Sequence, residues 1–131
     1  MVTLKRSDLL IDAAYLNGEW IKSETSFDVL NPSNGDHLAS VADCTVADAD
    51  AAIAAAAVAQ KEWAGRTGKE RAAVLRKWFD LMVANVDDLG AILTAEMGKP
   101  LAEAKGEIMY GASFVEWFAE EAKRVYGDTI P

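Results

Sequence analysis

The sequence predicts an α+β fold in which short strands and turns precede four consecutive helices. Two observations predict this order. Residues 1–44 place turn-forming residues between short apolar runs, which is typical of β-hairpins. Residues 45–127 place hydroxyl and acidic residues at helix-capping spacing, each followed by apolar residues at helical intervals. With 131 residues, the chain is long enough to bury a core.

The strand region contains two candidate hairpins. Residues 7–14 form a short helix or an ordered arm ahead of them. The first hairpin, residues 15–20, turns at Asn17-Gly18, a pair that tolerates positive φ at both central positions. The second joins strand 27–30 to strand 37–42 through a turn that contains proline and glycine. Strands this short need cover from another surface.

The first two helices are predicted to begin at capping boxes. A hydroxyl residue is followed three positions later by a carboxylate at Thr45 and Asp48, and again at Thr67 and Glu70. Nine alanines lie between residues 47 and 59. Because that helix carries so little side chain, we expect its backbone to pack close to a neighbour.

The third helix is predicted over residues 86–97. Asp87 and Asp88 fall in its first turn, where the helix dipole favours negative charge. Gly98 follows the last apolar residue and suits a left-handed C-terminal cap. These signals define both ends of the helix.

The fourth helix is predicted from Pro100, which suits a first helical position, to about Tyr126, a length of roughly 40 Å. It carries two apolar stripes, which indicates burial on more than one side. A four-helix chain of this size cannot cover both, so we infer that the second stripe faces something outside this chain. One stripe is Leu101, Ala104, Ile108, Gly111, Val115, Phe118, Ala122 and Val125, and the second is Gly106, Tyr110, Phe114 and Trp117.

Composition excludes several classes of protein. The net charge is -8 and the basic residues are scattered, so we expect neither nucleic acid nor an anionic membrane as a partner. The single cysteine, Cys44, excludes an internal disulfide. No run of about 20 apolar residues and no signal peptide is recognisable, which makes the cytoplasm the expected compartment.

No motif for catalysis, phosphate binding or metal binding is present. One cysteine and one histidine cannot build a structural zinc site. Cys44 lies between Asp43 and Thr45, and neither neighbour offers the base or positive charge that activates a nucleophilic thiol, so we expect a structural or incidental role. His37 is expected to be an ordinary surface histidine.

Two groups on the fourth helix could have a function. Its glutamates are best interpreted as a charge-balanced, solvated face, although Glu107 could equally be a buried carboxylate that caps another segment. The aromatic residues of the second stripe either pack in a core, which is the usual role of an apolar stripe, or line a hydrophobic channel. The glutamates are Glu103, Glu107, Glu116, Glu120 and Glu121.

Several stretches together resemble the N-terminal region of aldehyde dehydrogenases. Each is weak alone, but the ordered set covers nearly the whole chain. The run from Gly98 to Pro131 is most similar to members that act on succinate semialdehyde or glutarate semialdehyde. The stretches are residues 16–20, residues 31–35, Glu70-Arg71 followed by Leu75, residues 96–100 and residues 126–131.

The resemblance implies that residues 1–131 are the N-terminal fragment of a longer enzyme and belong to its Rossmann-like coenzyme-binding domain. That enzyme would oxidise succinate semialdehyde to succinate with NADP or NAD. In the family, the doubly wound sheet, the catalytic groups and the coenzyme contacts come later in the chain. We therefore expect no catalytic and no cofactor-binding residue here, no bound coenzyme, and no activity from the fragment alone.

The resemblance also implies two sites by position. The helix after Pro100 would border the substrate tunnel. Main-chain oxygens of Val29, Leu30 and Glu96 would contribute to a monovalent cation site. The tunnel-side residues would be Gly106, Tyr110, Phe114 and Trp117.

Other functions remain open on the sequence alone. The chain could be a truncated or standalone helical module that binds or assembles through its uncovered stripe. The parent enzyme could also take a different aldehyde, such as an amino-aldehyde. A small aldehyde is the expected substrate of the parent, and a homo-oligomer is the expected assembly.

Overall fold

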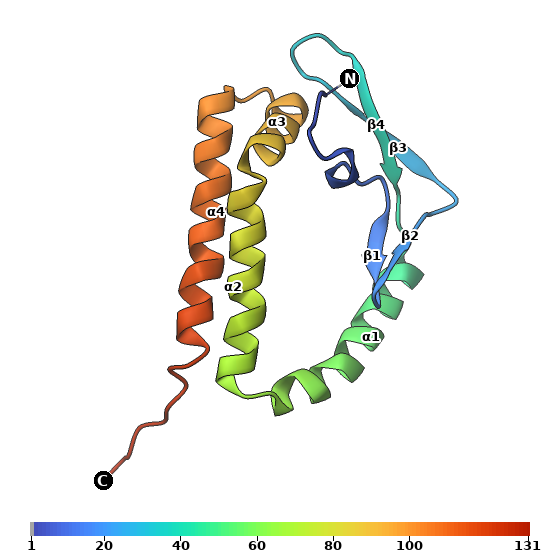
Figure 1. Cartoon of the computed structure of the whole chain (residues 1–131). Helices are drawn as coiled ribbons and strands as arrows, with labels where there is room; N and C mark the ends of the chain where they lie inside the picture. Colours follow the sequence, from blue (N-terminus) through green and yellow to red (C-terminus); the bar gives the residue numbers. More distant parts are fainter. Residues whose placement is uncertain (1) are drawn as a thin grey trace.

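The computed structural model describes residues 2–131, and within them two β-hairpins precede four helices (Figure 1). The predicted order of strands before helices is confirmed. The strands are β1 (Ala14–Leu16), β2 (Glu19–Ile21), β3 (Ser26–Leu30) and β4 (His37–Ala42). The helices are α1 (Val46–Gly65), α2 (Gly68–Ala84), α3 (Val86–Met97) and α4 (Leu101–Glu121).

Each hairpin pairs neighbouring strands in antiparallel fashion, as predicted. The β1–β2 turn has Asn17 at φ 49° and Gly18 at φ 90°, the positive values that this pair tolerates. β3 pairs with β4 and begins at Ser26, one residue before the predicted start. Of the predicted N-terminal helix or arm, only residues 7–9 form a 3-10 turn, and the chain then continues to β1 without regular structure.

Both predicted capping boxes are formed. At α1, the Thr45 N–H donates to the Asp48 carboxylate at 2.8 Å, and the Asp48 N–H donates back to the Thr45 hydroxyl. Thr67 and Glu70 make the same exchange at the start of α2. The end of α3 also agrees with the prediction, because Gly98 adopts a left-handed conformation with φ 77°.

The alanine-rich helix α1 does not pack as the sequence predicts. It contacts β1, but none of its residues is buried. Val46, Ile53 and Val58 are all exposed along its length. Within residues 2–131, the expected close approach of this helix to a neighbour is therefore not made.

The core lies where α2 and α4 run antiparallel side by side, with α3 across their adjoining ends (Figure 1). Small residues allow the helices to approach closely: a Cβ atom on Gly68 would lie 2.5 Å from the carbonyl oxygen of Ala122. A Cβ atom on Gly90 would lie 2.8 Å from Cγ of Lys105. The buried apolar residues of the described chain are Ala72, Ala104, Ala112 and Ala119.

Helix α4 is shorter than predicted at both ends. Pro100 is its N-cap rather than its first helical residue, and the helix ends at Glu121 rather than near Tyr126. Its length is therefore about 31 Å instead of 40 Å. The reason lies in α2, which begins at Gly68 opposite Ala122, so residues beyond that level have no helix to pack against.

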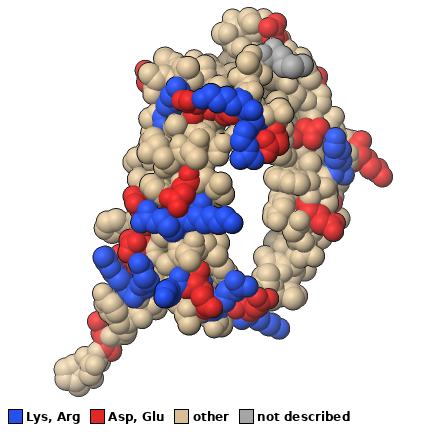
Figure 2. Space-filling view, in the orientation of Figure 1, with Lys and Arg blue, Asp and Glu red and all other residues tan. Residues whose placement is uncertain are grey.

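The molecule surrounds an opening. The α2–α4 pair forms one side, and α1 with the hairpins forms the other, while the space between them stays unfilled (Figures 1 and 2). The accessible surface is 9526 Å², whereas a compact monomer of 14.1 kDa exposes roughly 6,700 Å². The chain therefore leaves far more surface uncovered than a self-contained domain of this size.

Candidate functional site

The second stripe of α4 forms an exposed aromatic face. Tyr110, Phe114 and Trp117 are 66%, 49% and 62% exposed. Tyr110 and Phe114 meet edge to face, with ring centroids 4.9 Å apart at 86°. Gly106 continues the face one turn earlier, and no atom lies within 4 Å of its Cβ position. Packing of these aromatic residues in a core of this chain, the first interpretation, is wrong.

The small residues on the opposite side of α4 determine this orientation. Ala104, Ala112 and Ala119 are at most 1% exposed and lie against the neighbouring helices, so the large side chains point away. The other predicted stripe is only partly correct. Ile108 and Val115 are half-buried, whereas Phe118 and the residues at both ends of that stripe lie at or near the surface. Sequence reasoning gave weight to bulky residues and missed Ala112 and Ala119.

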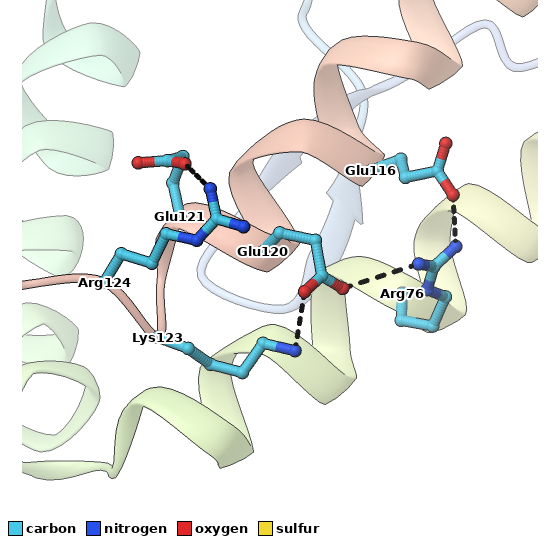
Figure 3. Close-up of polar contacts among 6 residues, drawn as sticks. All are labelled: Arg76, Glu116, Glu120, Glu121, Lys123 and Arg124. Carbon is cyan, nitrogen blue, oxygen red and sulfur yellow. Dashed lines mark hydrogen bonds and ion pairs between the residues drawn. The ribbon is translucent and has the colours of Figure 1, made fainter.

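A groove of about 660 Å³ lies along the C-terminal half of this face. Aromatic side chains of Phe114, Trp117 and Phe118 line it together with charged groups from α2 and α4. These charged groups are ion-paired (Figure 3): Arg76, Glu116 and Glu120 form one chain with Lys123, and Glu121 pairs separately with Arg124. The groove is therefore apolar along α4 and bordered by paired charges.

Arg76 of α2 is the centre of that ion-pair chain. Its Nη1 donates to Glu116 at 2.7 Å, and its Nη2 lies 3.6 Å from Glu120 (Figure 3). Lys123 lies 2.8 Å from the other oxygen of Glu120. These contacts lower the pKa of Glu120, chiefly through the hydrogen bond from Lys123. Arg124 and Glu121 pair at 3.0 Å within the C-terminal end of the α4 segment.

The prediction of a charge-balanced glutamate face agrees with these contacts. Glu107 pairs with Lys99 and is 44% exposed, so the alternative of a buried carboxylate is wrong for this chain. Glu103 is exposed on the same helix. On the face shown in Figure 2, most basic side chains likewise lie beside acidic ones.

Asp88 is a structural anchor that the sequence analysis missed. It is 6% exposed, and its two oxygens accept the backbone N–H groups of Lys5 and Arg6 at 3.1 and 2.9 Å. Its neighbour Asp87 pairs with Lys5 and Lys105, which lowers the Asp87 pKa. The sequence signal, two acids in a first helical turn, gives no hint of a partner more than 80 residues away.

The two candidate reactive residues have surface positions. Cys44 is a free, exposed thiol. His37 Nε2 lies 3.0 Å from Ser40 Oγ and 3.2 Å from Asp28 Oδ1, and Ser40 itself donates to that carboxylate oxygen at 2.7 Å. These hydrogen bonds lower the Asp28 pKa. Because the serine proton points to the carboxylate, this cluster does not have the order of a nucleophile, a base and an orienting acid.

The segments of the predicted cation site meet, but no ion site is defined. The turn that follows Leu30 reaches the end of α3, where a Cβ atom on Gly98 would lie 3.0 Å from Pro32. A cavity of about 310 Å³ lies at this junction, lined in part by Thr94. Within residues 2–131, no group of three or more His, Cys, Asp or Glu side chains is placed so that it could hold a metal ion. Val29, Leu30 and Glu96 as main-chain ligands stay a prediction.

No helix in residues 2–131 combines the length and the apolar character needed to cross a membrane.

Comparison with known proteins identifies the class. The family model described as "Aldehyde dehydrogenase family" matches residues 20–131. The chain therefore belongs to the aldehyde dehydrogenase family, as the motifs predicted. Strand hairpins followed by a helical region agree with the N-terminal segment of that fold, because the chain superimposes on an aldehyde dehydrogenase from Brucella melitensis with a TM-score of 0.98. The two are 54% identical, over 100% of this chain and 28% of the other.

Within the family, the similarity is to enzymes named for semialdehydes. The chain is 54% identical to the succinate-semialdehyde dehydrogenase [NADP(+)] of Escherichia coli. It is 52% identical to the glutarate-semialdehyde dehydrogenase of Pseudomonas putida. Each match covers 98% of this chain, which spans only 27% of the length of these relatives.

Proposed function

We propose that this chain is the N-terminal part of an enzyme that oxidises succinate semialdehyde to succinate with NADP or NAD. The similarity to succinate- and glutarate-semialdehyde dehydrogenases supports the substrate class, and the NADP(+) in the name of the Escherichia coli relative supports the coenzyme. The catalytic groups and the coenzyme contacts would come from the remaining length of the protein. Residues 1–131 alone are proposed to have no aldehyde dehydrogenase activity and to bind no coenzyme.

The part of this site that the chain itself would supply is one wall of the substrate tunnel. The observation that carries this proposal is the exposed aromatic face of α4, which Gly106, Tyr110, Phe114 and Trp117 form. Such a wall offers no charged group, so it would select a short aldehyde by shape and would exclude water from the reacting centre. The carboxylate of the substrate would be bound by groups outside this chain.

Two further features belong to the same proposal. Main-chain oxygens of Val29, Leu30 and Glu96 would bind a monovalent cation at the junction of the β3–β4 turn and α3. The whole enzyme would be a cytoplasmic homo-oligomer. Cation-dependent stability of the intact protein, compared between potassium, sodium and a bulky organic cation, tests the first feature.

The main experiment compares the 131-residue chain with the intact protein that contains it. Both are mixed with succinate semialdehyde and NADP+ or NAD+, and formation of the reduced coenzyme is followed. We expect turnover by the intact protein only. Turnover by the short chain would contradict the assignment of the chemistry to the rest of the protein.

The tunnel wall is tested with a matched pair of tyrosine variants in the intact protein. Tyr110→Ala should raise the KM for succinate semialdehyde by roughly tenfold, because it removes an apolar contact with the substrate. Tyr126→Ala removes an equally large and 80% exposed side chain from the segment after α4, and should leave KM unchanged. Equal effects of the two variants would argue against a tunnel role for Tyr110.

A second candidate substrate is favoured by one specific finding. The chain is nearly as similar to a glutarate-semialdehyde dehydrogenase as to the succinate enzyme. The ratio of kcat/KM for the two semialdehydes decides between them, and we expect it to favour succinate semialdehyde.

A standalone assembly module is the remaining alternative, which the excess exposed surface favours. It predicts self-association of the chain in light scattering.

A further inference from the structure

Every fully buried residue of α4 carries only a methyl side chain, whereas its larger residues Ile108 and Val115 are half-buried. The fully buried α4 positions are Ala104, Ala112 and Ala119. Helices are held in register when large side chains of one fit between those of the other. An alanine surface has little relief, so the buried alanines by themselves restrict the rotation of α4 on α2 only weakly.

Polar contacts at the edge of this interface supply the missing constraint. Arg76 projects from α2 and holds Glu116 at 2.7 Å and Glu120 at 3.6 Å, two carboxylates one helical turn apart on α4 (Figure 3). The planar guanidinium also lies over the ring of Phe79, 5.1 Å from its centroid, which limits its own freedom. One end of the fork donates a hydrogen bond to Glu116, and the other makes a longer ionic contact with Glu120, so Arg76 restricts α4 at two points.

We call the ion pairs of Arg76 with Glu116 and Glu120 the clamp. The clamp lies directly beside the aromatic face of α4. Glu116 is adjacent in sequence to Trp117 and two residues from Phe114, and all three line the same groove as Arg76. A rotation of α4 that moved Glu116 would turn both aromatic rings with it. All three ion-paired side chains are between 41% and 45% exposed, so solvent screens them and they add little to overall stability. Their larger effect would be on the rotation of α4 about its own axis.

We propose that Arg76 is a positioning residue for the substrate tunnel: by holding Glu116 and Glu120, it sets the rotation of α4 and thereby the direction of Phe114 and Trp117. The inference rests on the proposed function, because it assumes that these rings face the aldehyde. Arg76 itself does not touch the substrate. Its effect passes through the helix that it holds.

The test uses the intact protein and a matched control. Arg76→Gln removes the contact between helices, whereas Arg124→Gln removes an arginine that pairs with Glu121 of its own segment, in the same groove. We expect Arg76→Gln to raise the KM for succinate semialdehyde by about twofold to thirtyfold, with kcat within about twofold. Arg124→Gln should change neither. An unchanged KM in the folded Arg76→Gln protein would overturn the proposal.

A second variant keeps the test valid if Arg76→Gln folds poorly. Glu116→Gln breaks the same contact from α4 and should raise KM to a similar extent. The double variant should be no worse than either single one, because both remove one interaction. Additive effects would show that the two residues act separately and would overturn the clamp.

A readout independent of the reaction separates this inference from the proposed function. Fluorine NMR of the intact protein with fluorotryptophan reports the surroundings of Trp117, and Trp117→Phe assigns its signal. Arg76→Gln should move that signal, and Arg124→Gln should not. If the intact protein does not oxidise succinate semialdehyde, the proposed function fails, and this signal alone decides the clamp. An unmoved signal would overturn it.

Discussion

At the scale of single residues, the chain is held together by a few groups with partners distant in sequence. Asp88 binds the backbone of Lys5 and Arg6, and thereby joins the N-terminal arm to α3. Gly68 allows the start of α2 to touch the chain at Ala122. Each residue contributes to stability through one contact that is distant in sequence, so a substitution at either position tests that contact alone.

Asp88→Ala should lower the free energy of unfolding by about 1–3 kcal/mol, because it leaves two backbone donors without an acceptor. The measurement is urea denaturation followed by circular dichroism. Asp87→Ala is the control, since it removes an adjacent carboxylate whose partners are solvated lysines, and should cost much less. Equal losses would mean that charge at the start of α3, and not the bonds to the arm, stabilises the chain.

Gly68→Ala should destabilise the chain by about 1–3 kcal/mol, because the new methyl group would lie 2.5 Å from the carbonyl oxygen of Ala122. Gly65→Ala makes the same chemical change at the end of α1, where nothing lies within 4 Å. It should be neutral or stabilise by up to about 1 kcal/mol. Thermal unfolding of the two variants gives the comparison, and a destabilised Gly65→Ala would refute this account of Gly68.

At the scale of elements, local signals predicted the turns and helix starts, and distant contacts decided the rest. Asn17-Gly18 and the two capping boxes carry their partners within three residues, so their structure could be derived from the sequence. The burial of Ala112 could not, because it depends on where α2 lies. The exposure of Trp117 followed from a count of surfaces, because four helices are too few to cover both apolar stripes of α4. Its assignment to a tunnel depended on family resemblance.

The capping boxes make helix stability depend on pH. Hydrogen bonds from Thr67 lower the pKa of Glu70 below its ordinary value of 4.5. The unfolded chain therefore takes up the proton first as the pH falls, so this stabilisation is present above about pH 4.5 and is lost as the pH drops through the lower folded-state pKa. Unfolding curves across this range should show a smaller acid-induced loss in Glu70→Gln than in the wild type. Indistinguishable losses would contradict the prediction.

At the scale of the whole molecule, the chain buries less surface on folding than a compact domain of its size. An unfolded chain of 14.1 kDa exposes roughly 20,000 Å². With 9526 Å² still exposed after folding, this chain buries only about four-fifths of the area that a compact domain of its size would bury. The aromatic face of α4 and all of α1 contribute to that deficit.

The urea m-value of the isolated chain should therefore be about four-fifths of that of a compact protein of equal length, since m scales with the surface exposed on unfolding. Light scattering at the same concentration shows whether the chain is monomeric. A monomer with a full-sized m-value would mean that the open form shown in Figure 2 closes in solution.

The placement of the core has a consequence for synthesis on the ribosome. All four buried alanines lie between residues 72 and 119, on α2 and α4, which only α3 separates in sequence. Contacts between elements that are near in sequence form quickly, because little chain entropy is lost in closing them. The unit of α2, α3 and α4 can therefore assemble as soon as α4 has emerged from the ribosome. Folding of this segment would thus begin within residues 68–121 and not at its first residue.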